Sequence, residues 1–177
     1  GRGRILNVFE TGSVTGRNYV SGIVGYQYKV VNNFGNTFWW ITNAYAIGEI
    51  SGNENTPEES KIGGIIPEIR SRYGVGISKC YWCPETTKVE ISAGGEKRSI
   101  QDMAHESNYV DWDFENIWTI EENKTTPYLG DLPKPTSVKA DGIEGVVYFE
   151  GGDGTEENPY LIRTLEQLNA VRNSLTR

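Results

Sequence analysis

The two cysteines of the chain, Cys80 and Cys83, form a Cys-Tyr-Trp-Cys motif, a spacing that can carry redox or metal chemistry. A redox pair needs a helix start, where the thiolate is stabilised, but this motif lies in a strand-like stretch followed by Pro84. A zinc site needs two more ligands, and the sequence has no second cysteine pair and one histidine, His105. His105 also lacks a serine or cysteine partner at a triad spacing. We therefore expect buried thiols or a local disulfide, and no metal ion.

Acidic and aromatic residues alternate over 111–115, where Asp111, Asp113 and Glu115 enclose Trp112 and Phe114. Alternation on a strand places the acids on one face and the aromatics on the other. A glycosidase needs two carboxyl groups flanking the scissile bond, but acids two residues apart on a strand are more often its solvated face. The sequence therefore predicts that the chain is not an enzyme.

An acidic turn near residue 153 offers oxygen atoms to a calcium ion, from Asp153, Thr155, Glu156 and Glu157. The spacing lacks the ligand pattern and the ligand count of an EF-hand loop. We interpret these residues as a solvated turn, with calcium near Asp153 as the weaker alternative and no other cofactor.

Aromatic residues near the second strand-like segment could form a sugar-binding surface, and Trp39, Trp40 and Tyr26 are the candidates to face a ligand. Neighbouring residues of a strand point in opposite directions, so one of the two tryptophans should point outward. The alternative is that these rings fill a small β core.

The elements that position these residues are repeated. Three similar stretches start at Ile5, Ile41 and Ile77, each 36 residues after the one before, and the third is the most degenerate. A fixed period of this length indicates an array of stacked units. Within each unit, short alternating segments are separated by glycines, which predicts strands joined at tight corners, with Gly12 and Gly48 at two of them.

We expect equivalent residues to stack, with Ile5, Ile41 and Ile77 in one column and Phe9, Tyr45 and Tyr81 in another, because one unit cannot bury its apolar face alone. The predicted fold class is all-β, a right-handed parallel β-helix over roughly residues 5–92. An antiparallel β-sandwich is the alternative.

The composition divides the chain into three segments. Residues 1–129 hold the repeats and an aromatic-rich closing segment, residues 130–142 form a proline-containing linker, and residues 143–177 contain a strand and an amphipathic helix. Capping-box patterns predict helix starts at Ser99 and at Thr164. The candidate residues for self-association in the last segment are Tyr160, Leu165, Leu168 and Leu175.

That last segment has too little chain to build its own core. It could fold back on its own domain, pack on further sequence, or cover the open end of another copy. In the last case the contact joins two different surfaces and could propagate head to tail into a filament.

The residues that carry a family resemblance are Asn43, Tyr45, Ala46, Gly48, Ile50, Ser51, Gly52 and 63–66 in the second unit, and Asn7, Phe9, Thr11, Gly12, Val14, Gly16 and 21–25 in the first. With these residues the units resemble the GLUG repeat of bacterial cell-surface and secreted proteins, which reads roughly Asn, Tyr/Phe-Ala-Thr-Gly, Val-Ser-Gly, then Val-Gly-Gly-Leu-Val-Gly. Pro67 departs from it by replacing the last glycine, and Cys83 stands where an acidic residue is common. Residues 143–177 are similar to the start of another such repeat module. The resemblance implies a non-catalytic surface, adhesion or scaffold module outside a bacterial cell.

The composition of the chain limits the classes of partner that it could bind. The formal net charge of −7 argues against a nucleic-acid binder, which would need a basic face. No apolar stretch is long enough to span a membrane, and no signal peptide is visible at the start, which suggests a piece of a larger protein. The expected partners are other copies of the chain or neighbouring repeat modules, and a carbohydrate-binding module that recognises surface glycans is the alternative function.

Overall fold

The structure is a computed structural model, and it describes residues 3–26, 39–52, 60–69, 75–140, 149, 151–152 and 156–174. Among these residues the strands are β1 (Gly3–Glu10), β2 (Val14–Thr15), β3 (Tyr19–Ser21), β4 (Trp39–Ala46), β5 (Ile50–Ser51), β6 (Lys61–Gly63), β7 (Val75–Trp82), β8 (Glu96–Lys97), β9 (Trp118–Thr119) and β10 (Tyr128–Leu129). The helices are α1 (Pro84–Thr87), α2 (Leu165–Ser174) and the 3-10 turns η2 (Asp102–Ala104), η3 (Glu106–Asn108) and η4 (Thr136–Val138).

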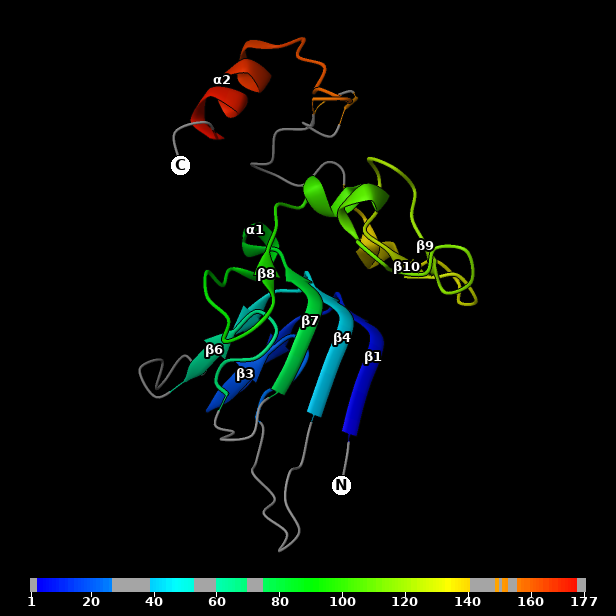
Figure 1. Cartoon of the computed structure of the whole chain (residues 1–177). Coiled ribbons are helices and arrows are strands. Elements are labelled where there is room, and N and C mark those ends of the chain that lie inside the picture. The colour runs from blue at the N-terminus through cyan, green and yellow to red at the C-terminus, as the bar shows by residue number, and fades with distance from the viewer. Residues whose placement is uncertain are drawn as a thin grey trace, which may run out of the picture.

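The three long strands form one parallel sheet in the order β1-β4-β7, and the short β8 pairs with the end of β7 (Figure 1). The predicted register is confirmed. Ile5 pairs with Ile41, which pairs with Ile77, and the Phe9–Tyr45–Tyr81 column is aligned in the same way. The second strands of the first two units also pair in parallel, as β2 with β5, and so do their third strands, as β3 with β6.

A left-handed residue interrupts each long strand at the same place. Asn7, Asn43 and Lys79 have φ values of 52°, 54° and 54°. Asparagine tolerates this conformation better than most residues. The Asn43 side-chain amide donates a hydrogen bond to Asn7 Oδ1 at 3.2 Å, and the Trp118 indole N–H donates to the same oxygen at 3.4 Å. These hydrogen bonds tie the first two strands to the closing segment.

The interruption divides the side chains between two cores. Ala44, Ala46 and the residues stacked on them pack with Ile41 and Ile65 inside the units. Tyr45 and Tyr81 point to the other side, where they meet the closing segment of residues 83–140. That second core is a cluster of aromatic rings. Its tightest contact joins Trp112 and Trp118, whose centroids are 4.4 Å apart. The Tyr45 hydroxyl donates a hydrogen bond to the backbone oxygen of Pro127.

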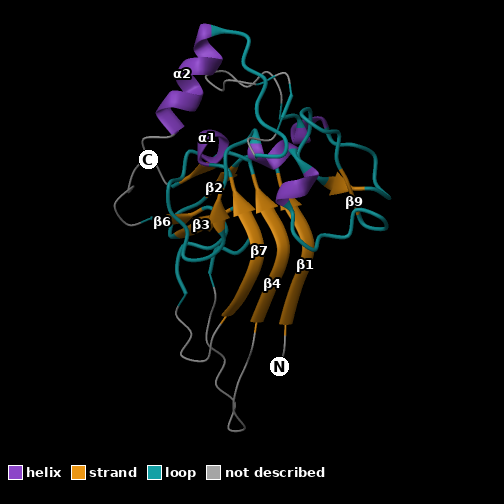
Figure 2. Ribbon diagram, turned by 45° about the horizontal axis from the view of Figure 1, so that its top comes forward, coloured by secondary structure: helices purple, strands orange, loops and turns teal. Residues whose placement is uncertain are grey.

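The closing segment lies at the carboxyl ends of β1, β4 and β7 (Figures 1 and 2). It contains turns, the three 3-10 helices and the antiparallel β9–β10 pair. The predicted helix near Ser99 is a 3-10 turn, Asp102–Ala104. Its backbone Asp102 N–H donates to Ser99 Oγ, and Ser99 donates to the Asp102 carboxylate. Part of the stretch predicted as a linker packs here as well, because Val138 and Ala140 are buried.

The last segment begins a helix as its capping box predicts. The Gln167 side-chain oxygen accepts hydrogen bonds from the backbone N–H groups of Arg163 and Thr164, and the Gln167 N–H donates to Thr164 Oγ1. Tyr160 stacks on Phe149 with ring centroids 4.4 Å apart.

The predicted fold class is wrong. The structure contains a four-stranded parallel sheet, two short parallel pairs and one antiparallel pair, together with helical turns, rather than an all-β parallel β-helix. The second and third strands pair over only two or three residues, so the regular winding does not persist beyond the long strands. In the third unit Pro84 starts the helix α1 where a strand would have to continue. The antiparallel β-sandwich is also wrong, because the long strands pair in parallel.

The glycine corners need a different explanation from left-handed backbone. Neither Gly12 nor Gly48 has a positive φ. A Cβ on Gly48 would lie 1.8 Å from the backbone oxygen of Gly12, so the close approach of the preceding unit requires glycine there. A Cβ on Gly12 would meet only the Glu10 carboxylate, at 3.8 Å.

Candidate functional site

The outer face of the β1–β4–β7 sheet carries a partly exposed tryptophan. Trp40 is 45% exposed, whereas its neighbour Ile41 is buried, as strand alternation requires. The ring packs on the third strand, because a Cβ on Gly76 would lie 2.2 Å from a ring carbon of Trp40. Gly76 and Arg4 are the register partners of Trp40 on the two flanking strands. The bare glycine therefore lets the indole lie close against the backbone while part of it stays open to solvent.

Polar and apolar groups border this tryptophan two residues further along. Leu6 is 51% exposed and pairs with Thr42, which pairs with Ser78. The hydroxyls of Thr42 and Ser78 are 3.2 Å apart and form a hydrogen bond. The outer face, defined as Arg4, Leu6, Trp40, Thr42, Gly76 and Ser78, thus combines one aromatic ring with hydroxyls and a guanidinium. Aromatic rings bordered by hydrogen-bonding groups are typical of ligand-binding surfaces.

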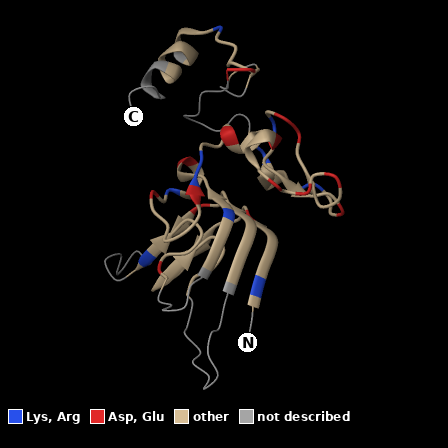
Figure 3. Ribbon diagram, viewed as in Figure 1, with Lys and Arg blue, Asp and Glu red and all other residues tan. Residues whose placement is uncertain are grey.

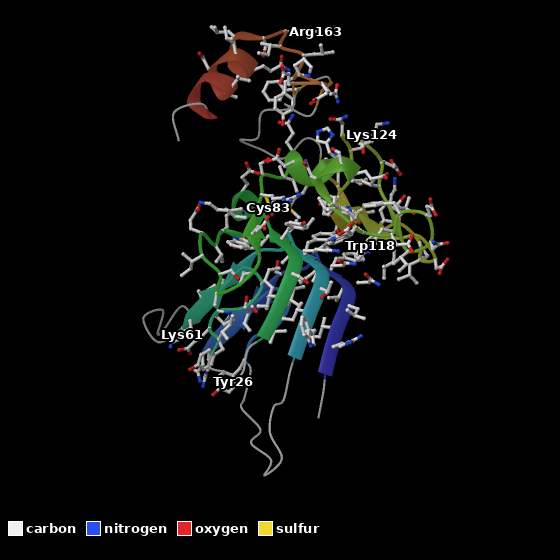
Figure 4. The ribbon with its side chains drawn as sticks, in the orientation of Figure 1. Tyr26, Lys61, Cys83, Trp118, Lys124 and Arg163 are labelled. Atoms are coloured by element: carbon white, nitrogen blue, oxygen red, sulfur yellow. The ribbon has the colours of Figure 1, made fainter. Side chains whose placement is uncertain are left out.

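The other aromatic candidates lie differently. Tyr26 is 45% exposed and packs against Tyr19 of β3, with ring centroids 4.5 Å apart. The ammonium group of Lys61 on the paired strand β6 lies 5.8 Å from the Tyr19 ring. Figure 4 shows Tyr26 and Lys61 on the β3–β6 side of the molecule. The side chain of Trp39 lies outside the described residues.

The cysteines are buried free thiols, one of the two predicted outcomes. Cys80 packs in the core inside the units, whereas Cys83 packs in the aromatic core. Burial raises the pKa of each thiol to about 11. A thiol of that pKa is almost fully protonated at neutral pH and is a poor nucleophile and a poor metal ligand. Both residues therefore fill the cores.

The remaining titratable candidates do not assemble a catalytic site. Asp111 makes an exposed ion pair with Lys79 at 2.9 Å, and Asp113 binds the side-chain amide of Asn116. His105 is buried, and its Nδ1 lies 3.0 Å from Glu122 Oε2. Among the described residues, no group of three or more His, Cys, Asp and Glu side chains could hold a metal ion. Asp153, the calcium candidate, lies outside the described residues.

The first unit leaves the end of the core open. β1 is an edge strand, since only β4 pairs with it among the described residues. Ile5, Val8 and Phe9 are only partly buried, whereas Ala44 and Tyr45, which stack on Val8 and Phe9, have no exposed surface. An uncovered parallel edge presents both apolar surface and unpaired backbone groups to another chain.

Glu10 at the end of this edge strand was missed by sequence reasoning. It pairs with Ala46 and points inward, beside the backbones of Gly12, Gly22 and Gly48. Neither carboxylate oxygen makes a hydrogen bond of good geometry among the described residues, although the backbone N–H groups of Gly12 and Gly48 lie close to it. Desolvation raises the pKa of Glu10 to about 7, and the backbone N–H groups of Gly48 and Gly12 offset only part of that rise. The one sequence signal for this residue was its register position, because an acid stands there where the next two units have Ala46 and Trp82.

Of the described self-association candidates, the two leucines of helix α2 are exposed. Leu165 is 73% exposed and Leu168 is 51% exposed, so the helix does not cover its apolar side within the described chain. Tyr160 is partly buried, and its hydroxyl donates to Asp102 Oδ1 at 3.4 Å. Leu175 lies outside the described residues.

None of the helices in the described part of the chain has the length and apolar character to cross a membrane. No protein-family model matches the chain, and comparisons with curated proteins and with solved structures gave no significant match. The resemblance to GLUG repeats therefore rests on the residues quoted for it and remains a prediction.

Proposed function

We propose that this chain is a non-catalytic structural and adhesive module of a bacterial cell exterior that associates with other copies of itself. The open β1 edge carries the proposal, because the apolar ends of the first unit are half-buried while their stacked equivalents are fully buried. Covering this edge with an apolar surface of another copy would remove its apolar side chains from water. The exterior location rests on the resemblance to bacterial surface repeats.

The complementary surface is the helix α2 and the residues before it. Leu161, Ile162, Leu165 and Leu168 are all between 42% and 73% exposed. Single exposed leucines are ordinary, but four within eight residues form an apolar patch of the kind found at interfaces. The two surfaces differ, so the contact is heterologous and repeats head to tail.

The test is the oligomeric state of the full chain by light scattering across a range of concentrations. We expect oligomers that grow with concentration. The double variant Leu165→Ser and Leu168→Ser should remain monomeric, because it removes two of the four apolar side chains of the patch without touching a buried residue. Leu132→Ser with Ile91→Ser is the matched control, since both side chains are exposed outside that segment.

Two outcomes would contradict self-association. One is a wild-type chain that stays monomeric at the highest soluble concentration. The other is oligomerisation that the control variant weakens as much as the helix variant does, because the contact would then be unspecific.

Glycan binding by the outer face is a second candidate function, and the exposed Trp40 ring favours it. Stacking of an indole on a sugar ring buries apolar area on both sides, and nearby hydroxyls and guanidinium groups can satisfy the sugar hydroxyls. In a glycan-array experiment Trp40→Ala should abolish binding. Tyr26→Ala should leave it intact, since it removes a ring of equal exposure elsewhere. An array with no bound glycan would remove this candidate.

A further inference from the structure

A groove in the closing segment collects lysines in a chain that is acidic as a whole. It has a volume of about 300 Å³ and lies between two segments, residues 121–125 and 134–139. This volume is at the lower end of the range for small-ligand sites. We call it the lysine groove; it is lined by Glu121, Lys124, Thr125, Lys134, Pro135, Thr136, Val138 and Lys139.

Backbone hydrogen bonds hold the two walls of the groove in place. The Ala140 N–H donates to the Lys124 carbonyl at 2.8 Å, and the Thr126 N–H donates to the Val138 carbonyl at 2.8 Å. Thr125 and Lys139 form an antiparallel bridge between the walls. Val138 in the floor is 1% exposed. The groove is therefore a fixed feature of the fold, so binding there would require little ordering of the backbone.

The charge in the lining is positive. The described lining contains three lysines and one carboxylate, that of Glu121, which accepts a hydrogen bond from the Lys134 ammonium at 2.7 Å. This hydrogen bond raises the pKa of Lys134. Figure 3 shows Lys/Arg and Asp/Glu segments around β9 and β10, and Figure 4 shows Lys124 at the outer side of the closing segment. Because solvent ions screen charges beyond about 8 Å, a local lysine cluster can attract an anion despite the net charge of −7.

We propose that the lysine groove binds the oxyanion group of a small polar ligand, a carboxylate, a sulfate or a phosphate. Lysine ammonium groups act as point charges toward such anions. The Thr136 hydroxyl at the rim can donate a hydrogen bond to an anion oxygen, and the Pro135 and Val138 surfaces can take the carbon part of the ligand. This site is separate from the open edge and the outer face, so its test does not depend on whether the chain self-associates.

The experiment is an NMR titration of the full chain at pH 7 and low salt, with sodium glucuronate, glucose 6-sulfate and inorganic phosphate as the three anionic probes and glucose as the neutral one. We expect the backbone amides of Thr125 and Thr136 to shift with at least one anionic probe and not with glucose. The probe that binds most tightly identifies the anion type. Added sodium chloride should weaken binding, as it does for exposed ion contacts.

Variants assign the effect to the groove. Lys124→Ala with Lys139→Ala should weaken binding about tenfold, whereas Lys97→Ala, an exposed lysine away from the groove, should leave it unchanged. Glu121→Gln should strengthen binding several-fold, because it removes the only carboxylate among the described residues of the lining. A variant with a damaged fold would bind the anion more weakly, so stronger binding cannot be explained by damage to the fold. The proposal is overturned if no anionic probe shifts these amides, if glucose shifts them equally, or if Glu121→Gln weakens binding.

Discussion

At the scale of single residues, Glu10 is the group whose ionisation should be visible in the stability of the protein. Its carboxyl group points inward, beside the backbones of Gly12, Gly22 and Gly48, and makes no hydrogen bond of good geometry among the described residues. Burial raises its pKa from 4.5 to about 7. The folded chain therefore holds this proton more tightly than the unfolded chain does.

The sign of the pH dependence follows from that order of pKa values. Below pH 4.5 Glu10 is protonated in the folded and in the unfolded chain, and its contribution to the free energy of unfolding is fully present. This contribution is lost as the pH rises towards 7, because Glu10 ionises first in the unfolded chain. We expect Glu10→Gln to match the wild type in free energy of unfolding at pH 4.5. At pH 7.5 it should exceed the wild type by about 1–3 kcal/mol. Urea unfolding at the two pH values measures both.

Other carboxyl groups also titrate in this window, so the comparison needs a control. Glu115→Gln changes an exposed acid and should track the wild type at both pH values. A Glu10→Gln variant with the same pH dependence as the wild type would show that the carboxyl group is solvated.

At the scale of elements, the register of the long strands was predictable because equivalent residues recur at one fixed spacing. Apolar residues such as Ile41 recur every 36 residues, and a shift of one residue would turn the inward set outward. The left-handed turn at Asn7 and Asn43 was not predicted, although an asparagine repeated at one position is a signal for it. In the third unit Lys79 holds the same conformation, so residue type alone would have missed that copy.

The glycine corner between the first two units gives a testable difference between two similar residues. Gly48→Ala would place a Cβ 1.8 Å from the backbone oxygen of Gly12, so the units must shift apart. We expect its free energy of unfolding to fall by about 1–3 kcal/mol. Gly12→Ala has room for its Cβ, so its effect should stay within about 0.5 kcal/mol. Equal effects of the two substitutions in thermal and urea unfolding would contradict the close approach.

At the scale of the whole molecule, the predicted fold class failed where the repeat ends. The periodic pattern extends over the long strands, and beyond Cys83 the packing depends on contacts between residues far apart in sequence. The hydrogen bond from the Tyr45 hydroxyl to the Pro127 carbonyl is one, and the bond from Trp118 to Asn7 is another. No local pattern encodes such contacts. The candidate sites differ in the same way. The exposure of Trp40 was predictable from strand alternation, whereas the lysine groove could not be predicted because turns bring its two segments together.

The stretch predicted as a linker provides the last prediction, because part of it belongs to the folded core. Val138 is 1% exposed and Ala140 is 0% exposed, and both are fixed by backbone hydrogen bonds to residues 124–126. A chain that ends after Ala140 keeps these contacts, whereas a chain that ends at Pro135 loses them. Loss of the buried valine and of two hydrogen bonds should cost about 3–5 kcal/mol.

We therefore expect the chain that ends at Ala140 to retain the melting temperature of the full chain, and to be monomeric if α2 makes the contact between copies. The chain that ends at Pro135 should melt several degrees lower. The substitution Val138→Ala in the full chain checks that the difference comes from packing, since it removes two buried methyl groups and leaves the backbone intact. Equal melting temperatures for the two truncated chains would show that residues 136–140 form a linker after all.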